Sequence, residues 1–180
     1  MKAMPQYIYT IGHSTHSHQH FLRLLQQVGI NCLVDVRSVA ASGYNPQYNK
    51  AALKCFLNDN GIQYLHFGTE FGARRAEPGM LDERGKVYLE RVVTSATFLA
   101  GVERLRKGMD RGYAIALMCA EADPLQCHRF HMISGYIVRQ GFDVLHILKE
   151  GSVLPHAQLQ LQLHKNDRTK QQPDIFSAHL

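Results

Sequence analysis

A short stretch in the second half of the chain holds several side chains that could do chemistry. The eleven residues from Cys119 to Arg129 contain two thiols, a carboxylate, an imidazole and a guanidinium, carried by Cys119, Glu121, Cys127, His128 and Arg129. A thiol beside a base can act as a nucleophile, and a guanidinium binds carboxylate or phosphate through two parallel hydrogen bonds. The stretch therefore predicts a site for a small anionic ligand, with Cys119 as nucleophile or redox thiol.

The strands and helices around this stretch decide where its side chains lie. Apolar and β-branched runs predict five strands, at residues 7–12, 32–36, 62–67, 113–118 and 142–148. Helical patterns lie between them, at residues 17–28, 49–60, 87–107 and 123–139. This alternation predicts a single-domain α/β fold, with a mainly parallel sheet of about five strands and helices on both faces.

Polar side chains gather where the predicted strands end. Residues of this kind lie at or after the end of each of the first four strands: His13, Ser14, Asp35, Arg37, His66, Arg74, Cys119 and Glu121. Ligands of open parallel sheets bind beside the carboxyl ends of the strands. Arg74 also lies in a long predicted loop, residues 68–85, and loops of this length are usually functional or disordered. We therefore expect an anion-binding cleft along this edge of the sheet.

Each candidate has an expected role in such a cleft. His13 and His128 are candidate bases, Glu121 is a candidate acid or orienting group, and Cys127 is a second candidate thiol. The substrate would be bound by Ser14, Asp35, Arg37, Arg74 and Arg129.

Structural interpretations of some of these residues stay open at this point. Cys127 also fits a small residue that is buried against the sheet. Asp35 interrupts an apolar strand and must be paired if it is buried, and Arg37 or Arg129 could be its partner. Arg129 could therefore brace the sheet, through Asp35 or Glu121, instead of binding an anion.

The turn before Cys127 has the pattern of a helix start. Asp123 and Gln126 have the spacing of a capping box, and Pro124 occupies the first helical position, where proline is favoured. Asp123 is therefore predicted to be a helix cap and not a catalytic acid. Free backbone N–H groups from about Leu125 onward would suit an anion.

Cofactor and metal motifs are weak in this sequence. None of the four cysteines lies in a CxxC pair, and neither GxxxxGK[ST] nor GxGxxG is present. The neighbouring histidines at 13, 16, 18 and 20 have no acidic or cysteine partner at local spacing. A mixed site is an alternative, formed by Cys119, Cys127, His128 and Glu121. The sequence predicts no metal and names no cofactor. Glu121 would repel an oxyanion bound between Cys119 and Arg129, which argues against a simple phosphatase loop.

The composition is that of an ordinary globular protein. With 180 residues, 45% of them hydrophobic, the chain can bury a core as one domain, which we place at residues 1–150. Residues 151–180 are expected to form a C-terminal extension of unassigned role, with one short strand or helix and a loose polar tail from Asn166. No apolar run approaches the roughly 20 residues of a membrane span, and no signal-peptide pattern is present. We therefore expect a cytoplasmic protein with no membrane partner, whose cysteines are thiols.

The charge of the chain favours anionic partners. The formal net charge is +5 with the histidines neutral, and no run of Lys and Arg is longer than two residues. A small anionic or nucleotide-like ligand is therefore the expected partner, and a nucleic acid is only weakly supported. The sequence leaves the oligomeric state open.

Three motifs together carry a resemblance to a known family. They are Thr10-Ile11-Gly12-His13-Ser14, Val34-Asp35-Val36-Arg37, and Cys119-Ala120-Glu121 with Cys127-His128-Arg129. With Pro46, Tyr64 and His66, they resemble the bacterial and archaeal family called domain of unknown function 488, over residues 7–150. The resemblance implies an α/β fold and no established activity.

The chain also departs from the pattern of that family. The family's arginine shortly after the Asp-x-Arg motif is missing from the run Ser38–Gly43. Phe71-Gly72-Ala73 replaces a Leu-Gly-Gly. These departures imply that the loops of the cleft bind a different ligand, or bind it differently.

Two functions follow as hypotheses. The first is an enzyme, a Cys/His-dependent hydrolase or transferase, that acts on a small anionic or nucleotide-like substrate at the strand ends. The rival is a non-catalytic nucleic-acid or nucleotide-binding module. A concave pocket with Cys119 at its floor would favour the enzyme, and a broad convex basic face would favour the binding module.

Overall fold

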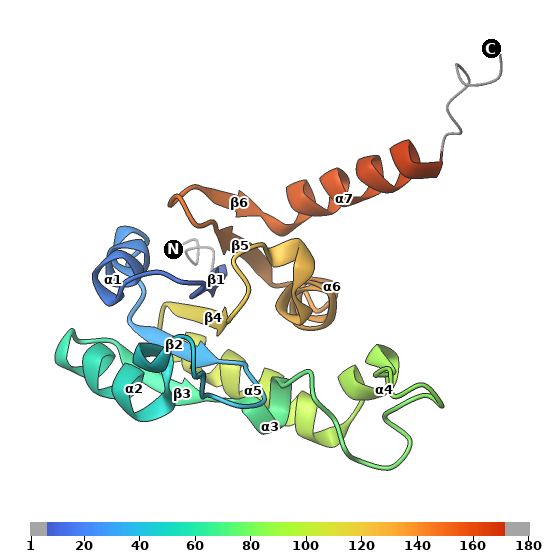
Figure 1. Ribbon diagram of the computed structural model, residues 1–180, viewed down its shortest axis with the longest axis horizontal. Coiled ribbons are helices and arrows are strands. Elements are labelled where there is room, and N and C mark those ends of the chain that lie inside the picture. Colours follow the sequence, from blue (N-terminus) through green and yellow to red (C-terminus); the bar gives the residue numbers. More distant parts are fainter. Residues whose placement is uncertain (1–6, 172–180) are drawn as a thin grey trace.

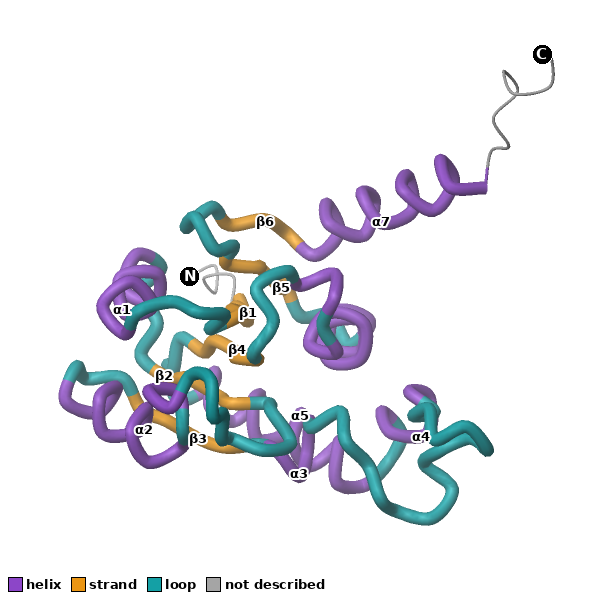
Figure 2. Tube along the Cα trace, in the orientation of Figure 1, coloured by secondary structure: helices purple, strands orange, loops and turns teal. Residues whose placement is uncertain are grey.

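A single six-stranded sheet in the order β3-β2-β4-β1-β5-β6 forms the centre of the molecule (Figure 1; Figure 2). The computed structural model describes residues 7–171, with side chains up to residue 165. The parallel strands are Tyr7–Gly12 (β1), Cys32–Asp35 (β2), Gln63–His66 (β3), Ile115–Cys119 (β4) and Asp143–Ile147 (β5). The short strand Val153–Pro155 (β6) pairs antiparallel with β5. The predicted α/β fold is confirmed, and β6 is one strand more than the sequence predicted.

Strand β4 lies at the middle of the sheet, and all of its residues are buried. Its apolar run Ile115–Met118 has no polar alternation, as expected for a strand that is covered on both faces. In the register of the sheet, Cys119 lies opposite Gly12 of β1, and Met118 lies opposite Asp35 of β2. The carboxyl ends of β1, β2 and β4 are therefore level, so the residues after them meet at one edge.

Helices cover both faces of the sheet, as predicted (Figure 1). Helices α1 (His18–Gln27) and α2 (Lys50–Asp59) pack on one face through Phe21, Leu25, Leu53 and Leu57. Ser17 caps α1, because its side chain accepts a hydrogen bond from the His20 N–H. The opposite face is covered by α5 (Ala96–Asp110), by a π-helical segment (Arg129–Ser134) and by α6 (Gly135–Arg139).

The predicted helix at residues 87–107 is wrong as one element. It is divided into α4 (Leu89–Val93) and α5, and the Ser95 side chain caps α5 by accepting from the Phe98 N–H. The cap begins a new helix at Ala96, because the Ser95 hydroxyl accepts from a backbone N–H that a continuous helix would bond to a carbonyl oxygen. The buried face of α5 contains Phe98, Val102 and Leu105, whereas Leu99 is 41% exposed.

The predicted helix at residues 123–139 also needs correction. A 3₁₀ turn spans Pro124–Gln126, Cys127 is extended with φ −126° and ψ 142°, and only then does the π-helical segment begin. The Asp123 side chain accepts from the Leu125 N–H, so it caps the 3₁₀ turn. The free N–H groups expected from Leu125 onward therefore do not form an anion site at a helix start.

The C-terminal extension contains the strand β6 and one helix, α7 (His156–Gln171). Alternating leucines left strand and helix open for this segment, and it is a helix. Helix α7 runs away from the sheet (Figure 1) and continues beyond Asn166, where a loose tail was expected; residues 172–180 lie outside the described residues. The long predicted loop after β3 holds a short helix, α3 (Gly68–Phe71). The described part of the chain contains no helix that is both long and apolar enough to cross a membrane.

Two buried histidines connect the start of α7 to the sheet. His146 Nε2 lies 3.1 Å from His156 Nδ1, and His146 Nδ1 lies 2.7 Å from Thr10 Oγ1. Burial lowers the pKa of His146 from 6.5 to about 3, with a further contribution from His156, and burial also lowers the pKa of His156. The native protein therefore holds these imidazoles neutral near neutral pH.

We expect the free energy of unfolding to fall as the pH drops from about 6.5 toward 3, because the unfolded chain binds protons that the native His146 and His156 exclude. Urea unfolding curves across this range would measure the slope. His146→Gln should reduce the slope, whereas His164→Gln, at an exposed position of α7, should leave it unchanged. Equal slopes in wild type and His146→Gln would contradict the assignment.

Candidate functional site

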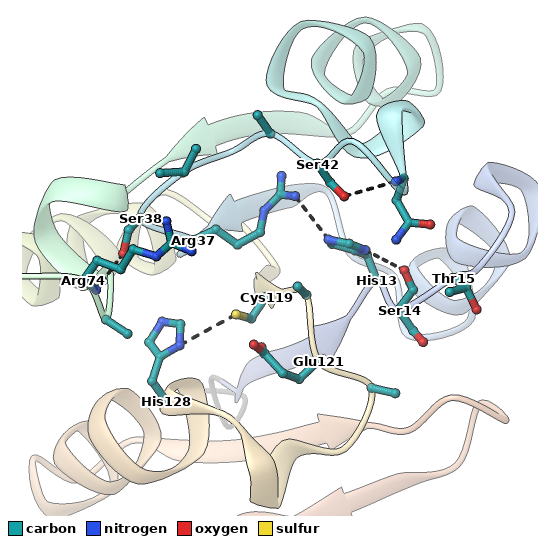
Figure 3. Close-up of a pocket in the computed structure, with 16 residues that line it drawn as sticks. His13, Ser14, Thr15, Arg37, Ser38, Ser42, Arg74, Cys119, Glu121 and His128 are labelled. Atoms are coloured by element: carbon teal, nitrogen blue, oxygen red, sulfur yellow. Dashed lines mark hydrogen bonds between the residues drawn. The ribbon is translucent and has the colours of Figure 1, made fainter. Parts of the chain in front are cut away.

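A polar cleft of about 560 Å³ opens at the carboxyl ends of β1, β2 and β4 (Figure 3). Its floor is formed by the residues that follow β4, and its walls come from the loops after β1 and β2 and from the Arg74 loop. The lining side chains that could act on a ligand are His13, Ser14, Arg37, Ser38, Ser42, Arg74, Cys119, Glu121 and His128. The strand ends thus bring together residues that are far apart in the sequence.

Four of the predicted residues form a tight cluster at the floor of the cleft. The ligating atoms of Cys119, Glu121, Cys127 and His128 all lie within 4.8 Å of one another. His128 Nδ1 lies 3.7 Å from the Cys119 sulfur and 3.8 Å from the Cys127 sulfur. Cys127 Sγ lies 3.0 Å from Glu121 Oε2. The cluster can move a proton among its members, and its donor types are those that could hold a metal ion.

The orientation of His128 follows from its second ring nitrogen. Nε2 lies 3.3 Å from the carbonyl oxygen of Val36, which can only accept a hydrogen bond, so Nε2 carries the proton. The lone pair of Nδ1 is then free and faces both sulfurs. Figure 3 shows the imidazole directed at the Cys119 sulfur. His128 is therefore placed to accept a proton from either thiol.

The two thiols differ in acidity because of what surrounds them. The hydrogen bond with Cys127, burial and the Glu121 carboxylate raise the pKa of Cys119. The hydrogen bond from Cys119, opposed by burial, lowers the pKa of Cys127, and His128 and Arg129 lower it further. Burial would raise the pKa of Glu121, but hydrogen bonds from the two thiols bring it below its ordinary value. At neutral pH Cys119 is therefore a neutral thiol that lines the cleft.

Arg129 holds the loop after β4 from below and does not line the cleft. Its side chain is completely buried and donates to the carbonyl oxygens of Glu121 (2.7 Å) and Ala122 (3.1 Å). The backbone N–H groups of His13 and Ser14 also bind this loop, at the carbonyl oxygens of Cys119 and Ala120. The bracing interpretation of Arg129 is supported, although its partners are backbone carbonyls and not Asp35 or the Glu121 carboxylate.

Gly12 lets this loop pass close to the end of β1. A Cβ atom on Gly12 would lie 1.8 Å from the carbonyl oxygen of Glu121 and 2.7 Å from its carbonyl carbon. No side chain fits there without movement of the backbone that carries Glu121. Gly12 is thus required for the same carbonyl position that accepts the Arg129 hydrogen bond.

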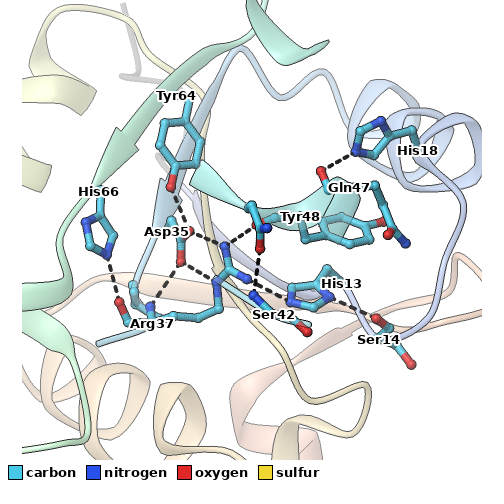
Figure 4. A network of polar contacts seen from close by, with 12 residues as sticks. His13, Ser14, His18, Asp35, Arg37, Ser42, Gln47, Tyr48, Tyr64 and His66 are labelled. Carbon is cyan, nitrogen blue, oxygen red and sulfur yellow. Dashed lines mark hydrogen bonds and ion pairs between the residues drawn. The ribbon is translucent and has the colours of Figure 1, made fainter. Parts of the chain in front are cut away.

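A buried ion pair fixes the wall formed by β2 (Figure 4). The Asp35 carboxylate accepts two hydrogen bonds from the Arg37 guanidinium, from Nε at 2.9 Å and from Nη2 at 2.6 Å. It also accepts one from the Tyr64 hydroxyl at 2.7 Å. Arg37 Nη2 donates further to the Tyr48 carbonyl, and Nη1 donates to His13 Nε2. Asp35 is therefore paired with Arg37, one of the two partners predicted for it.

His13 has both of its ring nitrogens occupied. Nδ1 donates to the Ser14 carbonyl at 2.8 Å, and Nε2 accepts from Arg37 at 3.1 Å. The ring stacks on Tyr48 with centroids 4.2 Å apart, and burial lowers its pKa to about 4. In this arrangement His13 orients Arg37, which leaves His128 as the base that faces a thiol.

The candidate residues thus divide into two groups. Most of them line the cleft, whereas Asp35, Cys127 and Arg129 lie behind its surface and are buried. Sequence reasoning missed the lining residues Thr15, Ser38, Ser42 and Asn45. The rule that ligands bind beside strand ends could have found Ser38 and Ser42, because both lie in the loop that follows β2. No sequence signal pointed to the packing of Tyr48 against His13.

The buried Arg37 and the exposed Arg74 should differ in how much stability the protein loses when each is replaced by alanine. Arg37→Ala leaves Asp35 buried without its cation, so we expect a loss of about 3–5 kcal/mol in the free energy of unfolding. Arg74 is exposed and makes no ion pair among the described residues, so Arg74→Ala should change stability by less than about 0.5 kcal/mol. Urea unfolding of both variants at neutral pH measures the difference; a neutral Arg37→Ala would contradict the role of the ion pair.

Gly12 gives a second stability test. Gly12→Ala forces the Glu121 backbone to move, and we expect it to destabilise the protein by about 1–3 kcal/mol, as overpacked positions do. Gly43→Ala is the matched control, because a Cβ atom there meets nothing within 4 Å. Thermal or urea unfolding would measure both changes. Equal stabilities of the two variants would contradict the prediction, because they would show that the loop after β4 can move without cost.

Comparison with known proteins gives one match. The family model described as domain of unknown function DUF488 matches residues 17–136, which include the Asp35-Val36-Arg37 and Cys119-Ala120-Glu121 motifs and Cys127-His128-Arg129. His13 and Ser14 lie just before the matched segment. No curated protein and no solved structure matches the chain. The family match covers most of the sequence and includes the floor of the cleft, and the chain belongs to the domain of unknown function 488 family.

Proposed function

We propose that this protein is a Cys/His-dependent hydrolase or transferase that acts on a small anionic or nucleotide-like substrate. The observation that carries the proposal is the Cys119–His128 pair, at 3.7 Å, on the floor of a concave polar cleft. A nucleophile and its base within hydrogen-bond reach are the signature of nucleophilic catalysis, and such contacts are often long before substrate binds. Most pockets that bind small molecules are of this size.

The cleft offers positive charge and hydroxyl groups to the anionic part of a substrate. Arg74 lines the rim with an exposed side chain, and its backbone N–H donates to Ser38 Oγ, which holds the rim loop against the β2 loop. Arg37 contributes less charge, because Asp35 neutralises it. Nη1 of Arg37 carries two N–H groups, and one of them is donated to His13 Nε2. Arg74 is therefore the main electrostatic attraction for an anion.

Glu121 restricts which atom of the substrate meets the sulfur. Its carboxylate lies in the same cluster as Cys119, so a phosphate group at that point would be repelled. The proposal therefore places an electrophilic carbon at Cys119 and the anionic group toward Arg74. A carboxylate or phosphate attached to a reactive carbon skeleton fits this arrangement.

The chemical step uses groups that the cleft contains. As the Cys119 sulfur bonds to the electrophilic carbon, its proton passes to His128 Nδ1. The bond from that carbon to the leaving group breaks, and the leaving group takes the proton from His128. Water then releases the product from sulfur in a hydrolase, and a second substrate does so in a transferase. Because the Cys119 pKa is raised, the thiol needs this base during attack.

The rival binding module gains little support from the surface charges. The basic cluster at the end of α5 is engaged within the chain: Arg104 pairs with Glu70 and lies over the Phe67 ring. Arg106 and Lys107 both lie near the Glu103 carboxylate. A broad free basic face is therefore not what these residues form, and the concave pocket favours the enzyme.

Alkylation of Cys119 tests the proposal without a known substrate. Chelator-treated protein is reacted with iodoacetate and with iodoacetamide, and modification of the Cys119 peptide is followed by mass spectrometry. We expect Cys119 to prefer the anionic reagent, relative to a neutral small thiol, because Arg74 attracts the anion. Arg74→Ala should abolish the preference, and Arg84→Ala, an exposed arginine outside the cleft, should retain it.

The base is tested in the same assay. His128→Asn should slow modification by both reagents at least roughly tenfold, since a positioned base contributes 10²- to 10⁴-fold to such steps. Circular dichroism of the variant checks that the fold is intact. A Cys119 that resists both reagents, or a reagent preference that Arg74→Ala leaves unchanged, would overturn the proposed function.

A further inference from the structure

We propose that Cys119, Cys127, His128 and Glu121 bind one Zn²⁺ ion. Two sulfurs, one imidazole nitrogen and one carboxylate oxygen lie within 4.8 Å of one another. They come from two chain segments, the end of β4 with its loop and the residues just before the π-helical segment. This inference goes beyond the proposed function, because it needs no substrate and no catalytic step.

The distances in the cluster are close to those of a tetrahedral zinc site. With Zn–S bonds near 2.3 Å and Zn–N and Zn–O bonds near 2.0–2.2 Å, neighbouring ligand atoms are separated by roughly 3.4–3.8 Å. His128 Nδ1 lies 3.7 and 3.8 Å from the two sulfurs, and Glu121 Oε2 lies 3.0 Å from Cys127 Sγ. All the remaining pairs of ligand atoms lie within 4.8 Å of one another.

The groups around the cluster already orient its members as metal ligands. A histidine ligand almost always donates its other ring N–H to a carbonyl or carboxylate. His128 does this through Nε2, toward the Val36 carbonyl, and so presents the lone pair of Nδ1 to both sulfurs. The Arg129 backbone N–H donates to Cys127 Sγ at 3.4 Å, which suits a sulfur that carries negative charge. These two contacts support a metal site separately from the distances between the four candidate ligand atoms.

Charge explains why a cation would be favoured here. The Cys127 thiol donates a hydrogen bond to Glu121 Oε2 at 3.0 Å, and a cation bound by both groups would take the place of that proton. A zinc ion would replace the thiol protons and leave two thiolates and one carboxylate around a double positive charge. The single remaining negative charge lies near the buried guanidinium of Arg129.

The donor set selects the class of metal. Thiolate and imidazole ligands favour zinc and related soft ions, whereas Mg²⁺ and Ca²⁺ require oxygen ligands. Two cysteines are too few for the four thiolates that hold an iron–sulfur cluster. Glu121 is the exposed member of the set and lines the cleft, so it is the ligand that an incoming molecule could replace.

Zinc and nucleophilic chemistry exclude each other at Cys119, because one sulfur cannot be a zinc ligand and attack a substrate freely. The metal-bound and metal-free proteins are thus two states, and zinc would hold Cys119 unreactive. Cys55, which is exposed on α2, stays outside the cluster in both states.

Metal titration of the full chain tests the inference. Chelator-treated protein is titrated with Zn²⁺ against a chromophoric zinc chelator, and in parallel with Co²⁺ to detect thiolate-to-cobalt charge-transfer absorption. We expect one ion per chain, with no competition from Mg²⁺. Cys127→Ala should weaken binding by more than the roughly 10- to 100-fold that loss of an outer hydrogen-bond partner costs, and Cys55→Ala should leave it unchanged.

A second variant covers the case in which the loss of a buried thiol disturbs folding. Glu121→Gln keeps the size of an exposed side chain, and it should fold normally yet bind Zn²⁺ at least tenfold more weakly. The inference is overturned if wild type retains no zinc. It is also overturned if Cys119→Ala and Glu121→Gln bind as tightly as wild type, which would place the ion at other residues such as the surface histidines.

The outcomes separate this inference from the proposed function. Zinc binding together with an unreactive Cys119 after metal removal would leave the zinc site standing and remove the nucleophile. A reactive Cys119 without zinc binding would do the reverse. Loss of Cys119 alkylation on zinc addition, with Cys55 alkylation unchanged, would support both.

Discussion

The buried charge of Asp35 is the constraint on which one side of the cleft depends. Its carboxylate has no exposed surface, so its partners must lie inside the protein. The side chains of Arg37 and Tyr64 provide three hydrogen bonds, and the Arg37 backbone N–H provides a fourth. Arg37 then connects this pair to His13, whose ring is fixed in turn by the Ser14 carbonyl. The buried carboxylate at the end of β2 thus sets the position of the loop after β1, although β4 lies between the two strands.

The other side of the cleft depends on carbonyl groups instead of side-chain charges. The loop after β4 has to turn back past the end of β1, and Gly12 leaves it the space to do so. The buried guanidinium of Arg129 holds this loop in place by donating hydrogen bonds to the carbonyl oxygens of Glu121 and Ala122. The sequence suggested that Arg129 binds an anionic ligand, but its charge instead stabilises the backbone that carries the reactive residues.

The sequence predicted the sheet and the edge where the site lies, because buried parallel strands have a simple apolar signature. β4 shows this most clearly, and the level ends of β1, β2 and β4 follow from parallel pairing. The break at Ser95 and the extended backbone at Cys127 could not be predicted, since both arise where local hydrogen bonds override helical periodicity. Nor could the sequence separate Arg74 from Arg37 and Arg129, because only packing decides which guanidinium reaches solvent.

The π-helical segment Arg129–Ser134 has a consequence for the residues just before it. Each of its turns takes up about one residue more than an α-helical turn, because its hydrogen bonds run from i to i+5. Successive residues of an α-helix are rotated by roughly 100° about its axis. A segment one residue shorter, with α-helical hydrogen bonds, would therefore change the direction in which Cys127 and His128 leave the helix, relative to Cys119. The alignment of imidazole and sulfurs is therefore encoded in the length of the chain behind them as well as in their own identities.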